Sequence, residues 1–141
     1  MMKGMAFLIL ILLCMGCKPK KDHRLKIRNN SNVDVIYLQS ESQDTSSYDF
    51  ISCAAGDVAH FIGSGEEKPV AVGIPWESIL DKPGSKMMFF VYTLDTVQHY
   101  VKVKDIPYSS SDCDQLKGRH LKRFDVTMAY LEQNNWTLVI Q

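Results

Sequence analysis

The chain has 141 residues, a length that fits one domain with a substantial hydrophobic core. Its 16 basic residues balance 16 acidic ones, which argues against a nucleic-acid-binding protein, because such proteins carry a strongly basic surface. The sequence also contains no internal repeat and no low-complexity tract.

The first predicted element is an uninterrupted apolar run over residues 5–15. The run is too short to span a bilayer, which needs about 20 apolar residues, but it fits the core of a secretory signal, which has about 7–15. Lys3 supplies positive charge ahead of this core, and small Gly16 stands before Cys17. We therefore predict that residues 1–16 are a lipoprotein signal peptide. Three other interpretations stay open: an ordinary signal peptide with a chance cysteine, an uncleaved anchor, and a buried strand of a cytosolic domain.

The stretch CMGC at residues 14–17 resembles a bacterial lipobox. This resemblance implies that Cys17 is acylated, with palmitate as an expected chain, and becomes the N-terminus of the mature protein. Cys14 is a poorer attachment site, because bulky Leu13 precedes it. Lipoproteins of this kind carry three acyl chains, and two or more chains give stable anchoring. We expect an exported protein that is anchored by lipid in a bacterial cell envelope, at the outer membrane.

Residues 17–23 are polar and are predicted to be a tether between the lipid and a single β-rich domain over residues 24–141. The tether contains Lys18, Lys20 and Lys21. These lysines and the following Arg24 either contact anionic lipid head groups, at about 1 kcal/mol each, or belong to a solvated linker.

Two cysteines, Cys53 and Cys113, remain in the predicted mature domain. An exported protein meets an oxidising compartment, so a disulfide between them is possible and would close a loop of about 60 residues. Two unbonded cysteines are the alternative. The sequence has no CxxC motif and no paired Cys/His spacing, so no structural zinc site is predicted.

Alternation predicts the first strand of the domain at residues 24–29, with Leu25 and Ile27 on its buried face. Asparagines that favour a turn follow, and residues 33–39 are predicted to form a second strand. We expect these two strands to pair as an N-terminal hairpin. Further short strands are predicted at residues 48–53, 58–62 and 69–74, followed by a short helix at residues 75–81 with Pro75 at its first position.

Residues 86–94 are the most apolar stretch after the signal and are predicted to form a strand that is buried on both faces. A turn at Asp95 and Thr96 is expected to lead into a strand at residues 97–104, which would form a hairpin with its predecessor. The last predicted elements are a strand at residues 120–127, a helix at residues 127–135 with Thr127 as its N-cap, and a strand at residues 136–141. Together they predict a mainly β fold, an antiparallel β-sandwich or barrel-like sheet with one or two short helices, one of them near the C-terminus.

Residues that point to chemistry are few. His60 and His99 share the strand parity of apolar neighbours, where a histidine is more often a core residue than a ligand. A metal site built from them and Asp57 would require their two predicted strands to pair. No GxSxG motif is present, and the glycines at residues 63–65 do not precede a helix, so neither a nucleophile elbow nor a phosphate cradle is predicted. The sequence assigns no catalytic, cofactor-binding or metal residue, and no cofactor is expected.

The last part of the chain resembles a group of small uncharacterised lipoproteins of Bacteroidetes. The shared pattern is Lys-Arg-aromatic-Asp, a short helix and Asn-Trp-Thr, found here at Lys122–Asp125 and Asn135–Thr137. The chain departs from the group at AAGD, where a proline-glycine turn is usual, and at TMAYLEQ, where a more acidic helix start is common. The resemblance implies a lipoprotein of the envelope and carries over no activity. We interpret Trp136 as a core anchor and Asp125 or Thr127 as the helix cap.

Our leading functional prediction is a non-enzymatic binding or interaction module that is anchored to the membrane by lipid and has a protein or glycan partner. The alternative from another class is a small hydrolase or metal-dependent enzyme that uses His60 or His99. A structure discriminates between them, because an enzyme needs several polar groups that converge in one pocket.

Overall fold

A computed structural model describes residues 21–40, 60–100 and 115–141. The predicted lipid-attachment residue Cys17 and the predicted disulfide partners Cys53 and Cys113 lie outside these ranges, as does the predicted strand at residues 48–53. No helix in the described part of the chain has the length and apolar character needed to cross a membrane.

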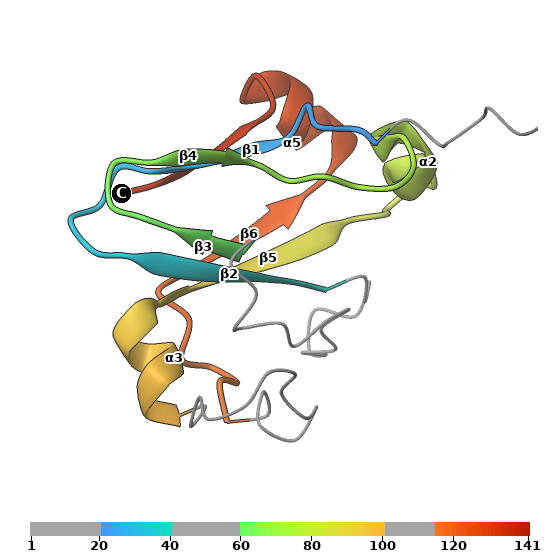
Figure 1. The fold of residues 1–141 in the computed structure, drawn as a ribbon. Helices are drawn as coiled ribbons and strands as arrows, with labels where there is room; N and C mark the ends of the chain where they lie inside the picture. The colour runs from blue at the N-terminus through green and yellow to red at the C-terminus, as the bar shows by residue number, and fades with distance from the viewer. Residues whose placement is uncertain (1–20, 41–59, 101–114) are drawn as a thin grey trace, which may run out of the picture.

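The described strands form two sheets that face each other in two layers (Figure 1). The three-stranded sheet has the order β4 (Glu67–Pro69), β1 (Lys26–Asn29) and β7 (Thr137–Ile140). The four-stranded sheet has the order β3 (Phe61–Ile62), β2 (Val35–Ser40), β5 (Met87–Thr93) and β6 (Lys122–Val126). Three short helices accompany them within the described residues: α2 (Trp76–Leu80), α3 (Leu94–Tyr100) and α5 (Met128–Gln133). The prediction of a mainly β, sandwich-like fold is confirmed.

The predicted N-terminal hairpin is wrong. β1 pairs antiparallel with β4 and parallel with β7, whereas β2 pairs with β3 and β5 in the other sheet. The asparagine-rich segment between β1 and β2 is therefore a corner that joins the two layers. Alternation shows which face of a strand is buried, but it does not show which strand lies beside it.

The space between the two sheets holds the larger core. Ile27 of β1 and Leu25 just before this strand pack with inner residues of β2 and β5, such as Tyr37 and Phe89, and α2 adds the fully buried Trp76. The remaining buried members of this inner core are Val35, Ile62, Val70, Leu80, Met87, Val91, Phe124, Val126, Leu131, Leu138 and Ile140.

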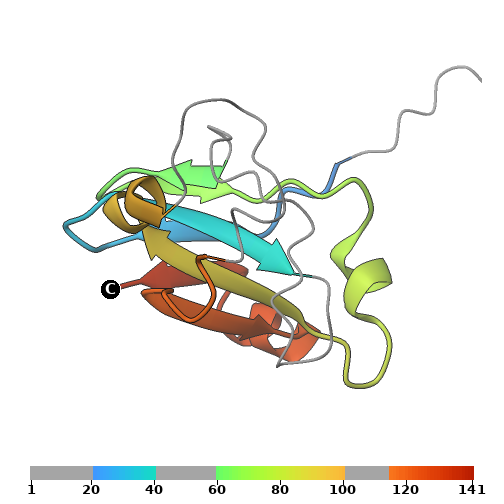
Figure 2. The ribbon, with the colours of Figure 1, turned by 90° about the horizontal axis from the view of Figure 1, so that it is seen from below.

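A second core covers the opposite, outer face of the four-stranded sheet. Residues of β2 and β5 that alternate with the inner ones form it, and Phe90 and Tyr92 are its largest members on β5. α3 lies on this side of the sheet, at the end distant from α2 (Figure 2), and adds buried Val97. The prediction that residues 86–94 form a strand buried on both faces is confirmed, since β5 lies between β2 and β6 and has a core on each side.

The predicted turn at residues 95–96 and the start of the predicted strand at residues 97–104 are wrong, because α3 occupies Leu94–Tyr100. Leu94, Val97 and Tyr100 recur every three residues, and all three pack against the outer core. The Thr93 hydroxyl accepts a hydrogen bond from the backbone N–H of Thr96 at 3.2 Å, which satisfies one of the free N–H groups at the helix start. Residues 101–104 lie outside the described part.

The C-terminal elements agree closely with the prediction. α5 follows β6, and the Thr127 hydroxyl caps it by accepting a hydrogen bond from the backbone N–H of Tyr130 at 3.1 Å. Thr127, and not Asp125, is therefore the helix cap; Asp125 instead pairs with Arg123 at 2.6 Å. β7 ends the chain beside β1, with Leu138 and Ile140 buried.

Candidate functional site

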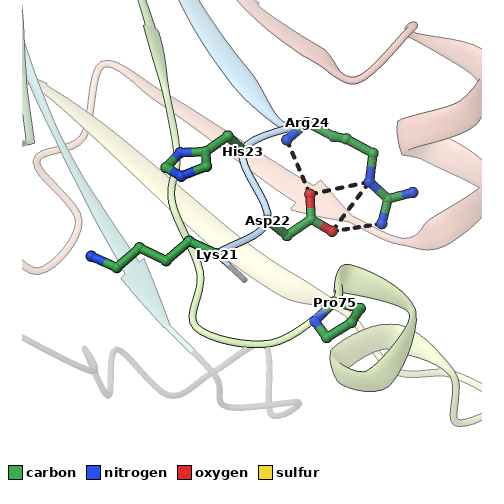
Figure 3. Close-up of a pocket in the computed structure, with 5 residues that line it drawn as sticks. All are labelled: Lys21, Asp22, His23, Arg24 and Pro75. Atoms are coloured by element: carbon green, nitrogen blue, oxygen red, sulfur yellow. Dashed lines mark hydrogen bonds and ion pairs between the residues drawn. The ribbon is translucent and has the colours of Figure 1, made fainter. Parts of the chain in front are cut away.

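The candidate site lies where the described part of the chain begins. An open pocket of about 550 Å³ lies there. Its described lining residues are Lys21, Asp22, His23, Arg24 and Pro75 (Figure 3). The chain is already part of the fold at this point, because Asp22 and Val72 exchange two backbone hydrogen bonds of 2.9 and 3.1 Å. Pro75 was predicted to be the first residue of this helix, but it is the N-cap of α2, and Trp76 is the first helical residue.

The Asp22 carboxylate, whose side chain is 10% exposed, joins two parts of the chain at the pocket wall. It accepts hydrogen bonds from the Arg24 side chain, at 2.6 Å from Nη2, and from the backbone N–H of Trp76 at 3.2 Å. The carboxylate thus satisfies a backbone N–H at the start of α2 that has no partner within the helix. Hydrogen bonding from the Arg24 side chain is the main cause that lowers the pKa of Asp22 to about 2, so this group is ionised at neutral pH.

Arg24 is the centre of the arrangement. Its two terminal nitrogens donate to the two carboxylate oxygens of Glu77 on α2, both at 2.6 Å, in the bidentate geometry that favours a strong ion pair. Its guanidinium carbon lies 4.1 Å from the centroid of the Trp136 ring, a cation–π distance. The pKa of Glu77 is lowered, chiefly by the hydrogen bond from Arg24. We call Asp22, Arg24, Glu77 and Trp136 the N-terminal clamp.

Trp136 reaches the clamp through an unusual backbone conformation. After α5, both Asn135 and Trp136 have positive φ angles of 49° and 58°. Asparagine tolerates this left-handed region, but a bulky residue such as tryptophan adopts it only where the surroundings hold it there. The turn reverses the chain from α5 into β7 and places the indole ring, which is half-buried, beside Arg24. Trp136 was interpreted as a core anchor; its ring packs against the inner core while only partly buried, and it also contacts Arg24.

The two histidines singled out by the sequence do not come together. The His60 ring stacks on Tyr37, with centroids 4.7 Å apart, and its Nδ1 lies 3.0 Å from the Tyr37 carbonyl oxygen. Tyr37 faces the inner core, whereas His99 is on α3, which covers the outer face of the same sheet. His99 is exposed, so its predicted core-facing position is wrong, because the segment is a helix and not a strand.

The geometry therefore supports no site that uses both histidines. Asp57, the third member of the conceivable metal site, lies outside the described residues. Within the described ranges, no group of three or more His, Cys, Asp or Glu residues could hold a metal ion. The alternative function, an enzyme that uses His60 or His99, would have to rely on one of them alone.

A second hollow, of about 520 Å³, lies between the edges of the two sheets. Its residues from β6 and β7 include Lys122 and Val139, and the Lys122 ammonium donates to the Val139 carbonyl oxygen at 3.0 Å. The same ammonium lies 4.9 Å from the centroid of the Phe124 ring. These contacts hold the two sheet edges together and protect the β7 edge, which is a structural task.

Comparison with protein-family models, with curated proteins and with solved structures finds no match to this chain. Its function is therefore inferred from its own residues and their geometry.

An acid titration tests the clamp. The pKa of Asp22 is lower in the folded protein than its ordinary value of 3.8, so the folded state loses stability as the pH falls from about 3.8 towards 2. We expect Asp22→Asn to unfold in urea with a flatter pH dependence in this range than the unaltered protein. The matched control is Asp81→Asn, an exposed carboxylate at the other end of α2, which should keep the steep dependence. Equal slopes for Asp22→Asn and the unaltered protein would contradict the role of this carboxylate.

Proposed function

We propose that the chain is a lipid-anchored protein of the bacterial cell envelope whose folded domain is a non-enzymatic binding module. The observation that carries the proposal is the short distance in sequence between the lipobox-like cysteine and the fold. Asp22 follows Cys17 by only five residues and is fixed by its pairing with Val72 and by the N-terminal clamp. An acyl group on Cys17 would hold a domain this close to it at the membrane surface.

The opposite end of the domain supports the binding part of the proposal. Figure 1 shows that the described chain begins beside α2, whereas the corner between β1 and β2 and the C-terminus lie at the other end. Two turns meet there, at residues 30–34 and 63–66, and we call them the distal turns. Their side chains are largely exposed, including the polar Asn30, Asn32 and Ser64.

Hydrogen bonds fix the distal turns relative to each other. Ser64 donates from its backbone N–H to Asp34 at 3.0 Å and from its hydroxyl to the Ser31 carbonyl oxygen at 2.8 Å. Behind them, the fully buried Asn29 bonds to both turns. A rigid pair of exposed turns at one end of a sandwich is an arrangement that loses little conformational entropy on binding. We propose the distal turns as the surface for a protein or glycan partner.

The lipid anchor is tested by the intact mass and the membrane fractionation of the native protein. We expect a mass that fits cleavage before Cys17 plus acyl chains, with the protein in the membrane fraction. Cys17→Ser should abolish acylation, and the matched variant Cys53→Ser, outside the CMGC stretch, should leave it unchanged. An unacylated native protein would overturn the proposal.

The same measurement before and after reduction tests the Cys53–Cys113 disulfide, because reduction adds a pair of hydrogens.

A further inference from the structure

We infer that the end of the domain around the N-terminal clamp rests on the lipid bilayer and that Ile74 is its apolar contact with the membrane. The inference depends on the anchor proposed above and adds to it an orientation and a contact residue. The occupant of this surface is the lipid surface that carries the anchor.

The length of the tether limits how far the domain can lie from the membrane. Fully extended, the five residues from Cys17 to Asp22 span at most about 18 Å. A domain of this size has a diameter of about 35 Å. The tether is therefore shorter than the domain is wide, so the domain cannot stand on its distal turns with the clamp facing away from the bilayer.

The loop before α2 lies beside the first described residues. Asp22 pairs antiparallel with Val72, which brings the chain after Val72 close to the first described residues. Ile74 is two residues further along this path, and Pro75 then lines the pocket beside Lys21 and Asp22. Ile74 thus lies at the end of the domain that holds Lys21, the first described residue.

Of the large hydrophobic residues exposed in the described part of the chain, Ile74 is the one at this end. Its exposed fraction is 52%, the highest of the exposed large hydrophobic residues among those described. Val72, two positions earlier, packs against the inner core and holds the loop in place. An exposed isoleucine on a fixed loop, close to a lipid anchor, has an apolar surface that the membrane interface can cover.

The charges at this end fit the same surface. Arg24 engages the carboxylates of both Asp22 and Glu77, and exposed Lys21 offsets the one negative charge that these three groups leave. The Lys21 side chain points away from Asp22 and Arg24 (Figure 3) and is exposed. A lysine in that position is suited to anionic head groups.

The test uses the native acylated chain in vesicles of phosphatidylethanolamine and phosphatidylglycerol with brominated acyl chains, which quench tryptophan fluorescence. Tryptophan is introduced as Ile74→Trp, and the signal of Trp76 and Trp136 is subtracted with the unaltered protein. Leu121→Trp is the matched control, because Leu121 is 50% exposed and is bonded to Val91, towards the other end of β5. Val33→Trp in a distal turn is a second control.

We expect the added fluorescence of Ile74→Trp to be quenched several-fold more than that of Leu121→Trp or Val33→Trp. Quenching of Ile74→Trp no stronger than that of both controls would overturn the inference. The anchor is checked on the same samples by intact mass. Should no acyl chain be found, the same three variants are tethered by a histidine tag in place of residues 1–17 on vesicles with nickel-chelating lipid. That arrangement decides the orientation even when the proposed anchor fails.

Discussion

Alanine in place of Phe89 or of Phe90 is expected to lower the free energy of unfolding by about 3–5 kcal/mol in each case. The two residues are neighbours on β5, and their exposed fractions are 0% and 1%. Successive side chains of a strand point to opposite faces, so Phe89 belongs to the inner core and Phe90 to the outer one. Each substitution leaves a cavity in a different core, and equilibrium unfolding in urea measures both losses.

The comparison between the two variants is the informative part. A sandwich with a single core would lose much stability with Phe89→Ala and little with Phe90→Ala. Leu121→Ala, which removes a side chain that is 50% exposed, is the surface control and should change stability by no more than about 0.5 kcal/mol. A Phe90→Ala variant as stable as this control would contradict the outer core under α3.

The two-sided burial of β5 illustrates what could be predicted from the sequence. Residues 86–94 are apolar at both parities, and that pattern indicates a strand covered on both faces. The segment after it is compatible with two structures, a strand and a helix. Val97, His99 and Val101 alternate as in a strand, but Leu94, Val97 and Tyr100 also recur every three residues as in a helix. The outer core decides between the patterns, and that core is assembled from distant parts of the chain.

Which strands pair with each other was harder to predict from the sequence, for the same reason. β1 and β2 are separated by a short asparagine-rich turn, which is the ordinary signal for a hairpin. The structure instead sends them to different sheets and gives β1 the C-terminal strand β7 as a parallel neighbour. Local residues specify the turn, whereas the choice of neighbour depends on how the whole apolar surface is buried.

The N-terminal clamp could not be predicted at all. The predicted tether of residues 17–23 contains Asp22, and Arg24 is only the first residue of the predicted strand at residues 24–29. Their partners Trp76 and Glu77 come 54 and 53 residues later, and no motif links such distant positions. The lipobox resemblance at Cys17, by contrast, depends on neighbouring residues only, and it remains a prediction that the mass measurement decides.

Asn29→Asp is expected to destabilise the protein by about 3–5 kcal/mol, the cost of placing an uncompensated charge in a buried position. Asn29 is fully buried, and its side-chain N–H groups donate to the carbonyl oxygens of Val33 at 2.7 Å, Gly63 at 3.2 Å and Ile62 at 3.3 Å. Its side-chain oxygen accepts from the Ser31 hydroxyl at 2.6 Å. An ionised carboxylate has only acceptor oxygens. One of them would face the three carbonyl oxygens that the Asn29 amide N–H groups bond to, and these contacts would become repulsive.

The matched control is Asn30→Asp, which makes the same chemical change one residue later at an exposed position. Its expected effect is no more than about 0.5 kcal/mol, because the new charge stays in water. Urea unfolding compares the two variants, and hydrogen exchange at the amides of Ser31 and Gly65 reports whether the distal turns loosen first. Equal losses of stability would contradict the network around Asn29. A loss of stability for Asn29→Asp alone would mean that one buried amide holds together the two turns that connect the sheets. The distal surface would then be positioned by a side chain that a partner does not contact.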